Sequence, residues 1–191
     1  MSDDDARETW DARYAAGRFD PTGPPGWLEE LGEELPSEGV ALDLAAGAGR
    51  VSIWLARRGL SVEAVDISPV GLALAREAAS DEGVNIKTRV ADLSSEQLPE
   101  GPYRLIACFH YRQPGLLHRL VDTLTPGGVL LGEVATVKNL ERHPRPSRRW
   151  LVEPNELLRE ARDLDVVYYR EAWLGGRHLA RIVARAASRV G

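Results

Sequence analysis

Short apolar runs alternate through the middle of the chain with segments whose apolar positions recur at helical spacing. The runs at residues 40–44, 62–65 and 103–109 suit buried strands, and residues 50–58, which follow the first run, suit an amphipathic helix. Alternating strands and helices of this kind are typical of a parallel sheet covered by helices. We therefore expect a doubly wound α/β fold over residues 40–133.

The same pattern predicts the remaining elements. Helices are expected over residues 5–16, 27–35, 69–80 and 116–124 and just after Pro154, with strands over residues 85–90, 125–133, 165–170 and 177–186. Residues 136–150 are polar and interrupted by prolines, which argues against a helix there. The last two strands are separated by Gly175 and Gly176, so we expect them to form an antiparallel pair.

A glycine turn follows the first strand. Gly47 and Gly49 allow a tight turn and a close approach of the backbone to a ligand, and the next helix points its N-terminal amides at the same place. Asp66 ends the second strand, where a carboxylate can accept hydrogen bonds from both hydroxyls of a ribose. Ser68 and Pro69 then predict an N-cap and the first turn of a helix. The pattern indicates a Rossmann-like site for a cofactor that contains ribose.

Two further residues narrow the choice of cofactor. A dinucleotide site needs a third glycine, and Ser52 stands at that position. Asp43 lies inside the first strand, where its charge would oppose a pyrophosphate but would suit a cofactor that carries positive charge. S-adenosylmethionine (SAM) is such a cofactor, because it carries an ammonium and a sulfonium.

On these residues the chain resembles the class I SAM-dependent methyltransferases, and among them the small bacterial enzymes related to tellurite-resistance and thiopurine methyltransferases. Their first motif is an acidic strand residue followed by a Gly-x-Gly turn, as at residues 42–49. Residues 90–93 look like the segment whose acidic residue binds adenine, and residues 103–111 look like the fourth strand with the loop at the methyl-transfer site. Residues 125–128 look like the Pro-Gly-Gly turn before strand five, and the resemblance covers roughly residues 10–184.

The resemblance implies a seven-stranded, mostly parallel sheet with an antiparallel last strand and helices on both faces. It also implies SAM as the cofactor, S-adenosylhomocysteine (SAH) as its product, and in-line transfer of the methyl group to a small molecule. In related enzymes an N-terminal Trp-x-x-Arg-Tyr segment, here Trp10 to Tyr14, tends to contact the methionine end of the cofactor, which would make residues 1–36 a helical lid; an amphipathic surface helix is the alternative. The expected cofactor-binding residues are Arg13, Tyr14, Asp43, Ala45, Gly47, Gly49, Arg50, Asp66, Ile67, Ser68, Ala91, Asp92, Leu93, Phe109 and His110.

The acceptor side of the site is expected after the fourth strand and in a basic segment at residues 142–150. His110 and Tyr111 are candidate catalytic residues, because an oxygen or nitrogen acceptor usually has to lose a proton, whereas a thiol needs little help; a loop histidine and a packing tyrosine are the alternative. The basic segment fits either a cap that attracts an anionic acceptor, with Trp150 as an apolar wall, or a solvated loop. The expected substrate-side residues are Trp10, Tyr111, Arg112, Arg145 and Arg148.

Length and composition fit an enzyme of this kind. At 191 residues the chain is expected to be one domain, with the lid followed by a cofactor-binding core over residues 37–133 and a substrate-side part over residues 134–191. The net charge of −5 argues against a nucleic-acid partner, and no apolar run is long enough for a membrane span. The acidic N-terminus lacks the layout of a signal peptide, so we expect a cytoplasmic protein, as a monomer or weak homodimer. The lone Cys108 is expected in the core, and no metal is expected, since no ligands show metal-site spacing.

Two other functions stay open at this point. An NAD(P)-dependent oxidoreductase would share the sheet and the ribose-binding Asp66, although Ser52 and Asp43 argue against it. A SAM-binding protein without catalysis would share the whole cofactor site, because methyl transfer requires few side chains of its own.

Overall fold

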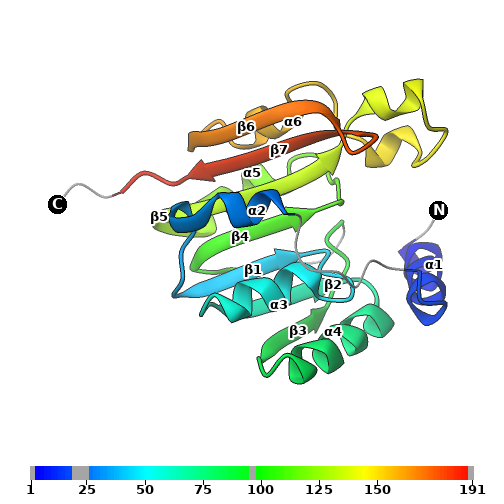
Figure 1. Cartoon of the computed structure of the whole chain (residues 1–191), viewed down its shortest axis with the longest axis horizontal. Helices are drawn as coiled ribbons and strands as arrows, with labels where there is room; N and C mark the ends of the chain where they lie inside the picture. Colours follow the sequence, from blue (N-terminus) through cyan, green and yellow to red (C-terminus); the bar gives the residue numbers. More distant parts are fainter. Residues whose placement is uncertain (1–2, 19–25, 95–97, 189–191) are drawn as a thin grey trace. The chain divides into compact units, whose positions relative to one another are not determined.

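The computed structural model describes residues 3–18, 26–94 and 98–188 (Figure 1). The chain forms two compact units, Met1–Leu98 and Pro99–Gly191, and each is described by itself below. The expected single domain with its lid, core and substrate-side part stays a prediction.

The first unit carries a parallel sheet of three strands in the order β3-β2-β1. Its elements are α1 (Asp3–Ala15), α2 (Trp27–Glu30), the 3-10 helix η1 (Gly32–Glu34), β1 (Val40–Leu44), α3 (Arg50–Arg57), β2 (Ser61–Asp66), α4 (Pro69–Asp81) and β3 (Ile86–Val90). Helices α3 and α4 pack on these strands. The packing follows from the sequence pattern: Leu42 and Leu44 of β1 and Leu55 of α3 are fully buried, as expected for a buried parallel strand and the apolar face of its helix.

The second unit carries four strands in the order β4-β5-β7-β6. Its elements are β4 (Tyr103–Phe109), α5 (Leu116–Leu120), the 3-10 helix η2 (Val121–Thr123), β5 (Leu124–Ala135), the 3-10 helices η3 (Val137–Glu141) and η4 (Arg148–Trp150), α6 (Glu156–Glu160), β6 (Asp165–Leu174) and β7 (Arg177–Arg185). Strand β5 is parallel to β4 and antiparallel to β7, and β7 is antiparallel to β6. Cys108 of β4 is buried, as the sequence predicts.

The seven strands follow the order β3-β2-β1-β4-β5-β7-β6 along the sheet. All observed pairings are parallel except those made by β7, so the last strand of the chain is the reversed one. This confirms the expected α/β fold class, a Rossmann-like sheet that is mostly parallel and has helices packed on it. Within the described residues, no helix has the length and apolar character needed to cross a membrane.

The structure differs from the expected elements at several boundaries. The helix expected over residues 27–35 is split into α2 and η1, because Gly32, the first residue of η1, adopts a left-handed φ of 45°. Residues 136–150, expected to be irregular, contain two short 3-10 helices, one before Pro144 and one after Pro146. The prolines therefore limit the length of these helices rather than excluding them.

Candidate active site

The turn between β1 and α3 is built on left-handed backbone conformations. Ala45, Gly47 and Gly49 have φ of 54°, 55° and 83°. The Gly49 amide donates to the Ala46 carbonyl oxygen at 2.9 Å, which closes the turn. A Cβ on Gly49 would lie 2.7 Å from the Cβ of Ala75 on α4, so glycine is required there by close packing as well as by φ. The predicted glycine turn is thus present, at the carboxyl end of β1.

Asp66 connects this turn to the start of α4. The side chain is buried, and its Oδ2 accepts the Gly47 amide at 2.8 Å while its Oδ1 accepts the Ser68 amide at 2.8 Å. Burial raises the pKa of Asp66, and the hydrogen bonds from these two amides oppose the rise. Ser68 caps α4 as predicted, since its Oγ accepts the Gly71 amide at 3.0 Å.

Helix α1 lies against the same place. The carboxylate of Asp11 accepts a hydrogen bond from the Ser68 hydroxyl and, at 3.4 Å, from the Val70 amide at the start of α4. The ring of Tyr14 packs on the backbone of Gly47 and Gly71, so closely that a Cβ on either glycine would collide with it. The pKa of Tyr14 is raised, chiefly by burial and further by the charge of Asp66. Helix α1 thus lies beside α4 (Figure 1), and its Tyr14 side chain contacts the glycine turn within the first unit.

The other residues of the expected lid stack outward from Tyr14. The Trp10 ring lies 5.8 Å from the Tyr14 ring in a stacked arrangement, and the Arg13 guanidinium lies 4.7 Å from the centre of the Trp10 ring. Trp10 is 36% exposed. The structure thus brings Trp10, Arg13 and Tyr14 together on one side of α1, as a continuous aromatic and cationic stack.

The two residues that depart from a dinucleotide site are paired with each other. Ser52 of α3 donates through Oγ to Oδ2 of Asp43 at 2.5 Å, and Asp43 is only 1% exposed. Burial raises the pKa of Asp43 to about 7, although the bond from Ser52 lowers it. The sequence interpretation treated Asp43 and Ser52 separately. No sequence motif with this spacing indicates that a strand residue and a residue of the next helix pair with each other.

We expect this pair to make stability depend on pH. Because the pKa of Asp43 is higher in the folded protein than in the unfolded chain, its burial lowers the free energy of unfolding as pH rises from about 4 to about 7. An Asp43→Asn variant lacks this titration and keeps an acceptor for Ser52. Its stability relative to the native chain should increase by about 2–3 kcal/mol between about pH 5 and about pH 8, measured by urea unfolding.

An Asp163→Asn variant provides the control, because it removes an exposed carboxylate instead of a buried one. If the free energies of unfolding of Asp43→Asn and the native chain differed by the same amount at every pH, this titration could not be assigned to Asp43.

The remaining predicted residues of the first unit lie at the ends of neighbouring strands. Asp92, which follows β3, is buried, and its Oδ1 accepts the Ser94 amide at 2.8 Å. Ala91 and Leu93 beside it are also buried, and the Ala91 amide donates to the Asp66 carbonyl oxygen at 3.0 Å. Because β1, β2 and β3 are parallel, the glycine turn, Asp66 and Asp92 all lie at the carboxyl edge of this sheet. Ile67 and Arg50 are half-buried at the same edge.

In the second unit, His110 follows β4 and lies next to a buried carboxylate. Its φ is 57°, which is rare for a residue with a side chain, and its amide donates to the Glu133 carbonyl oxygen at 2.8 Å. The His110 Nε2 lies 3.8 Å from Oε1 of Glu133, whose Oε2 accepts a hydrogen bond from Nε of Arg181 at 2.6 Å. The imidazole is 45% exposed. Phe109, before it, is buried and meets the imidazole edge-on.

The sequence interpretation missed the Glu133–Arg181 pair. Glu133 ends an apolar run in β5, and Arg181 is its direct cross-strand neighbour in β7. A carboxylate inside a buried strand is a signal that could have been followed, since buried charges are usually paired. The register between β5 and β7, which selects Arg181 as its partner, is not readable from the chain.

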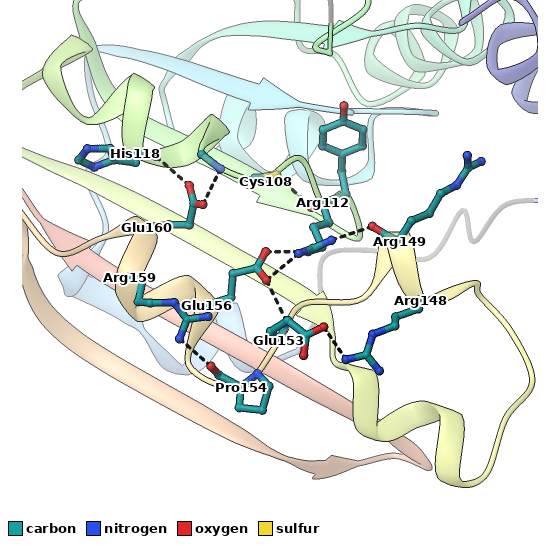
Figure 2. Close-up of polar contacts among 12 residues, drawn as sticks. Cys108, Arg112, His118, Arg148, Arg149, Glu153, Pro154, Glu156, Arg159 and Glu160 are labelled. Carbon is teal, nitrogen blue, oxygen red and sulfur yellow. Dashed lines mark hydrogen bonds and ion pairs between the residues drawn. The ribbon is translucent and has the colours of Figure 1, made fainter. Parts of the chain in front are cut away.

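Arg112 joins the loop after β4 to α6 and η4 (Figure 2). Its Nε and Nη2 donate to the two carboxylate oxygens of Glu156 at 2.6 and 2.8 Å, and its Nη1 donates to the Arg149 carbonyl oxygen at 3.0 Å. Burial by itself would raise the pKa of Glu156, but hydrogen bonds from Arg112 and from the Glu153 amide outweigh it, so the pKa lies below its usual value. Hydrogen bonding to Glu156 in turn raises the pKa of Arg112.

The predicted substrate-side arginines therefore differ in their surroundings. Arg112 is engaged by Glu156, and Arg148 donates to Oε1 of Glu153 at 2.7 Å (Figure 2), whereas Arg145 is exposed. The Tyr111 ring lies 6.2 Å from the Trp150 ring, and the guanidinium of Arg149 lies 4.7 Å from the centre of that ring. The structure thus brings Tyr111 and Trp150 together, and it adds Arg149, which the sequence interpretation did not single out.

Replacing Arg112 tests how strongly the second unit depends on the pair with Glu156. An Arg112→Gln variant leaves a largely buried carboxylate without its cation, so we expect the free energy of unfolding to fall by about 2–4 kcal/mol. The control is Arg57→Gln, which breaks the exposed pair with Glu82, where the side chains are 63% and 52% exposed, and should cost less than about 1 kcal/mol. Equal losses in urea unfolding of the two variants would contradict this role of Arg112.

No group of three or more histidine, cysteine, aspartate and glutamate side chains suited to a metal ion occurs among the residues that the structure describes.

The sequence resembles those of known methyltransferases. Residues 41–128 match the model of the methyltransferase domain family. A ubiquinone biosynthesis O-methyltransferase of Xylella fastidiosa (strain 9a5c) is 31% identical over 136 residues, which cover 62% of this chain and 54% of that protein. The chain thus spans about half the length of this curated relative.

Solved structures agree on the fold. TehB from Haemophilus influenzae superposes with a TM-score of 0.72 at 22% identity, covering 92% of this chain and 67% of that one. The magnesium protoporphyrin IX methyltransferase of Synechocystis PCC 6803, solved with bound SAH, superposes with a TM-score of 0.64 at 16% identity, covering 95% and 83%. Residues 41–128 of this chain thus resemble the methyltransferase domain family, and the chain shares its fold with TehB and with the magnesium protoporphyrin IX methyltransferase.

Proposed function

We propose that this chain transfers a methyl group from SAM to a small-molecule acceptor and releases SAH. The observation that carries the proposal is the geometry of Asp66, a buried carboxylate whose two oxygens accept the amides of Gly47 and Ser68. Each oxygen keeps a second acceptor site, so the same carboxylate can also receive the hydroxyls of a ribose. The methyltransferase domain that contains these residues supports SAM over a dinucleotide.

The residues around Asp66 fit this cofactor. Gly47 and Gly49 present backbone without side chains, and Asp92 adds a second buried carboxylate at the same edge. Ala91 and Leu93 would flank an adenine ring. Bound there, SAM would supply a methyl group that is already activated by the positive charge on its sulfur. The task left to the chain is to orient an acceptor and to exclude water.

We further propose that His110 takes the proton of an oxygen or nitrogen acceptor. Its imidazole is partly exposed, and Glu133 lies close enough to Nε2 to stabilise the imidazolium that forms. In this arrangement Nδ1 receives the proton, and Nε2 faces the carboxylate. Arg181 holds Glu133 in place, and Tyr111 lines the acceptor side as the next residue along the loop.

Two further observations support a small molecule as the acceptor. The relative from Xylella is named as an O-methyltransferase, which favours an oxygen acceptor, with a small thiol or other anion as the alternative. The net charge of −5 suits a small molecule better than a nucleic acid. The proposal describes a cytoplasmic enzyme that acts as a monomer or weak homodimer.

Release of SAH tests the proposal. The purified chain is incubated with SAM and a panel of phenols, aromatic carboxylates and small thiols, and SAH is measured against a reaction without acceptor. At least one acceptor should raise the rate well above this background. Tight binding of SAH without release from any acceptor would contradict methyl transfer and would indicate a SAM-binding protein without catalysis.

A further inference from the structure

An aromatic pair with a neighbouring cation lies next to His110 in the second unit. Tyr111 and Trp150 are both partly exposed, and their rings are 6.2 Å apart at an angle of 46°. The guanidinium of the exposed Arg149 lies over the Trp150 ring. Two tilted rings and a cation form a surface that is apolar in the middle and positive at its edge.

The network in Figure 2 fixes this surface in place. Arg112 follows Tyr111 directly, and it holds both the Glu156 carboxylate and the Arg149 carbonyl oxygen. The 3-10 helix η4, which carries Arg149 and Trp150, is therefore tied to the loop that carries Tyr111. A ligand that binds there meets a surface whose backbone is already ordered, which reduces the entropy lost on binding.

The two carboxylates of the network beside this surface each have an arginine partner. Glu156 is paired with Arg112, and Glu153 is paired with Arg148. Arg142 lies elsewhere, with its guanidinium 3.8 Å from the centre of the Trp173 ring. The guanidinium that lies over the aromatic pair is that of Arg149.

We propose that this surface binds the methyl acceptor and selects a planar anion, an aromatic carboxylate or phenolate. Its ring packs against Tyr111 and Trp150, and its negative group meets the guanidinium of Arg149. An exposed contact between Arg149 and an aromatic ring is weaker than a charge-assisted hydrogen bond to a carboxylate, so the guanidinium turns from the Trp150 ring to the anion. The identification of the ligand as the acceptor rests on the proposed methyl transfer.

Three probes that share a six-membered ring separate the parts of this selectivity. They are 4-hydroxybenzoate, a planar anion; cyclohexanecarboxylate, an anion without an aromatic ring; and phenol, an aromatic ring without a carboxylate. Dissociation constants are measured by NMR titration, with and without saturating SAH. We expect 4-hydroxybenzoate to bind about 10-fold more tightly than either of the others.

Variants test whether the preference for 4-hydroxybenzoate arises at this surface. Arg149→Gln should weaken the binding of 4-hydroxybenzoate about 10-fold and leave phenol unchanged, while Arg149→Lys should restore part of the loss. Trp150→Leu should weaken both aromatic probes and spare cyclohexanecarboxylate. Arg142→Gln is the matched control, because it removes an arginine of the same segment that lies on a different ring.

The outcomes separate this proposal from the proposed function. Equal affinities for the three probes, no measurable binding of 4-hydroxybenzoate, or equal losses in the Arg142 and Arg149 variants would each overturn the selectivity for planar anions. Failure to bind SAH would instead overturn the proposed function, and the titrations without SAH would still decide whether the surface prefers planar anions.

Discussion

An Asp66→Ala variant is expected to lose at least about 100-fold in affinity for SAH. The carboxylate is proposed to accept two ribose hydroxyls, and each hydrogen bond to a charged group contributes about 1.5–3 kcal/mol. The same change also removes the acceptor of the Gly47 and Ser68 amides, which loosens the glycine turn and the start of α4. Both effects lower affinity, and isothermal titration with SAH measures their sum.

Two controls separate the loss of the hydroxyl contacts from unfolding. Asp66→Asn keeps one carbonyl acceptor for the turn and should show a smaller loss. Glu82→Ala removes an exposed acid that lies after α4 and should leave the affinity for SAH unchanged. If Asp66→Ala bound SAH as tightly as the native chain while keeping a native melting curve, Asp66 would not be a cofactor residue.

A His110→Asn variant is expected to lower kcat by about 10²–10⁴-fold with an oxygen acceptor. Asparagine tolerates the left-handed backbone conformation at this position better than most residues, so the loop after β4 should keep its path. The loss arises because the acceptor proton no longer has a base near the Glu133 carboxylate. Initial rates of SAH release at saturating SAM measure it.

A thiol acceptor provides the internal control for His110. At a pH where the thiol is already ionised no base is required, so the same variant should methylate it at nearly the native rate. A Glu133→Gln variant should show an intermediate loss with the oxygen acceptor, since it removes the charge that stabilises the imidazolium. Equal losses of kcat with thiol and oxygen acceptors would contradict a proton-transfer role for His110.

The sequence predicted the parts of the site that depend on local backbone chemistry. The glycine turn, the strand-ending Asp66 and the Ser68 cap follow from short-range requirements of φ, of strand ends and of helix starts, and the structure places all three as expected. The apolar runs also predicted the buried strands, since burial on both faces leaves a clear pattern, and the Gly175–Gly176 turn predicted the antiparallel last pair.

The pairs between distant side chains could not be predicted in the same way. Arg112 finds Glu156 and Arg181 finds Glu133 only after α6 and β7 have packed, and a chain rich in arginine offers many partners of equal charge. For the same reason the sequence did not indicate that Arg148 pairs with Glu153 or that Arg149 lies over the Trp150 ring, and the substrate-side role of Arg148 stays a prediction. Charge type can be read from sequence, whereas the partner depends on tertiary packing.

The most direct test of the central claim is isothermal titration of the native chain with SAH, with NAD and NADP in parallel. We predict micromolar binding of SAH and no measurable binding of either dinucleotide, because Ser52 and Asp43 occupy positions that disfavour a pyrophosphate. Binding of NAD or NADP in preference to SAH, or no binding of SAH at all, would contradict the assignment of the glycine turn and Asp66 to SAM.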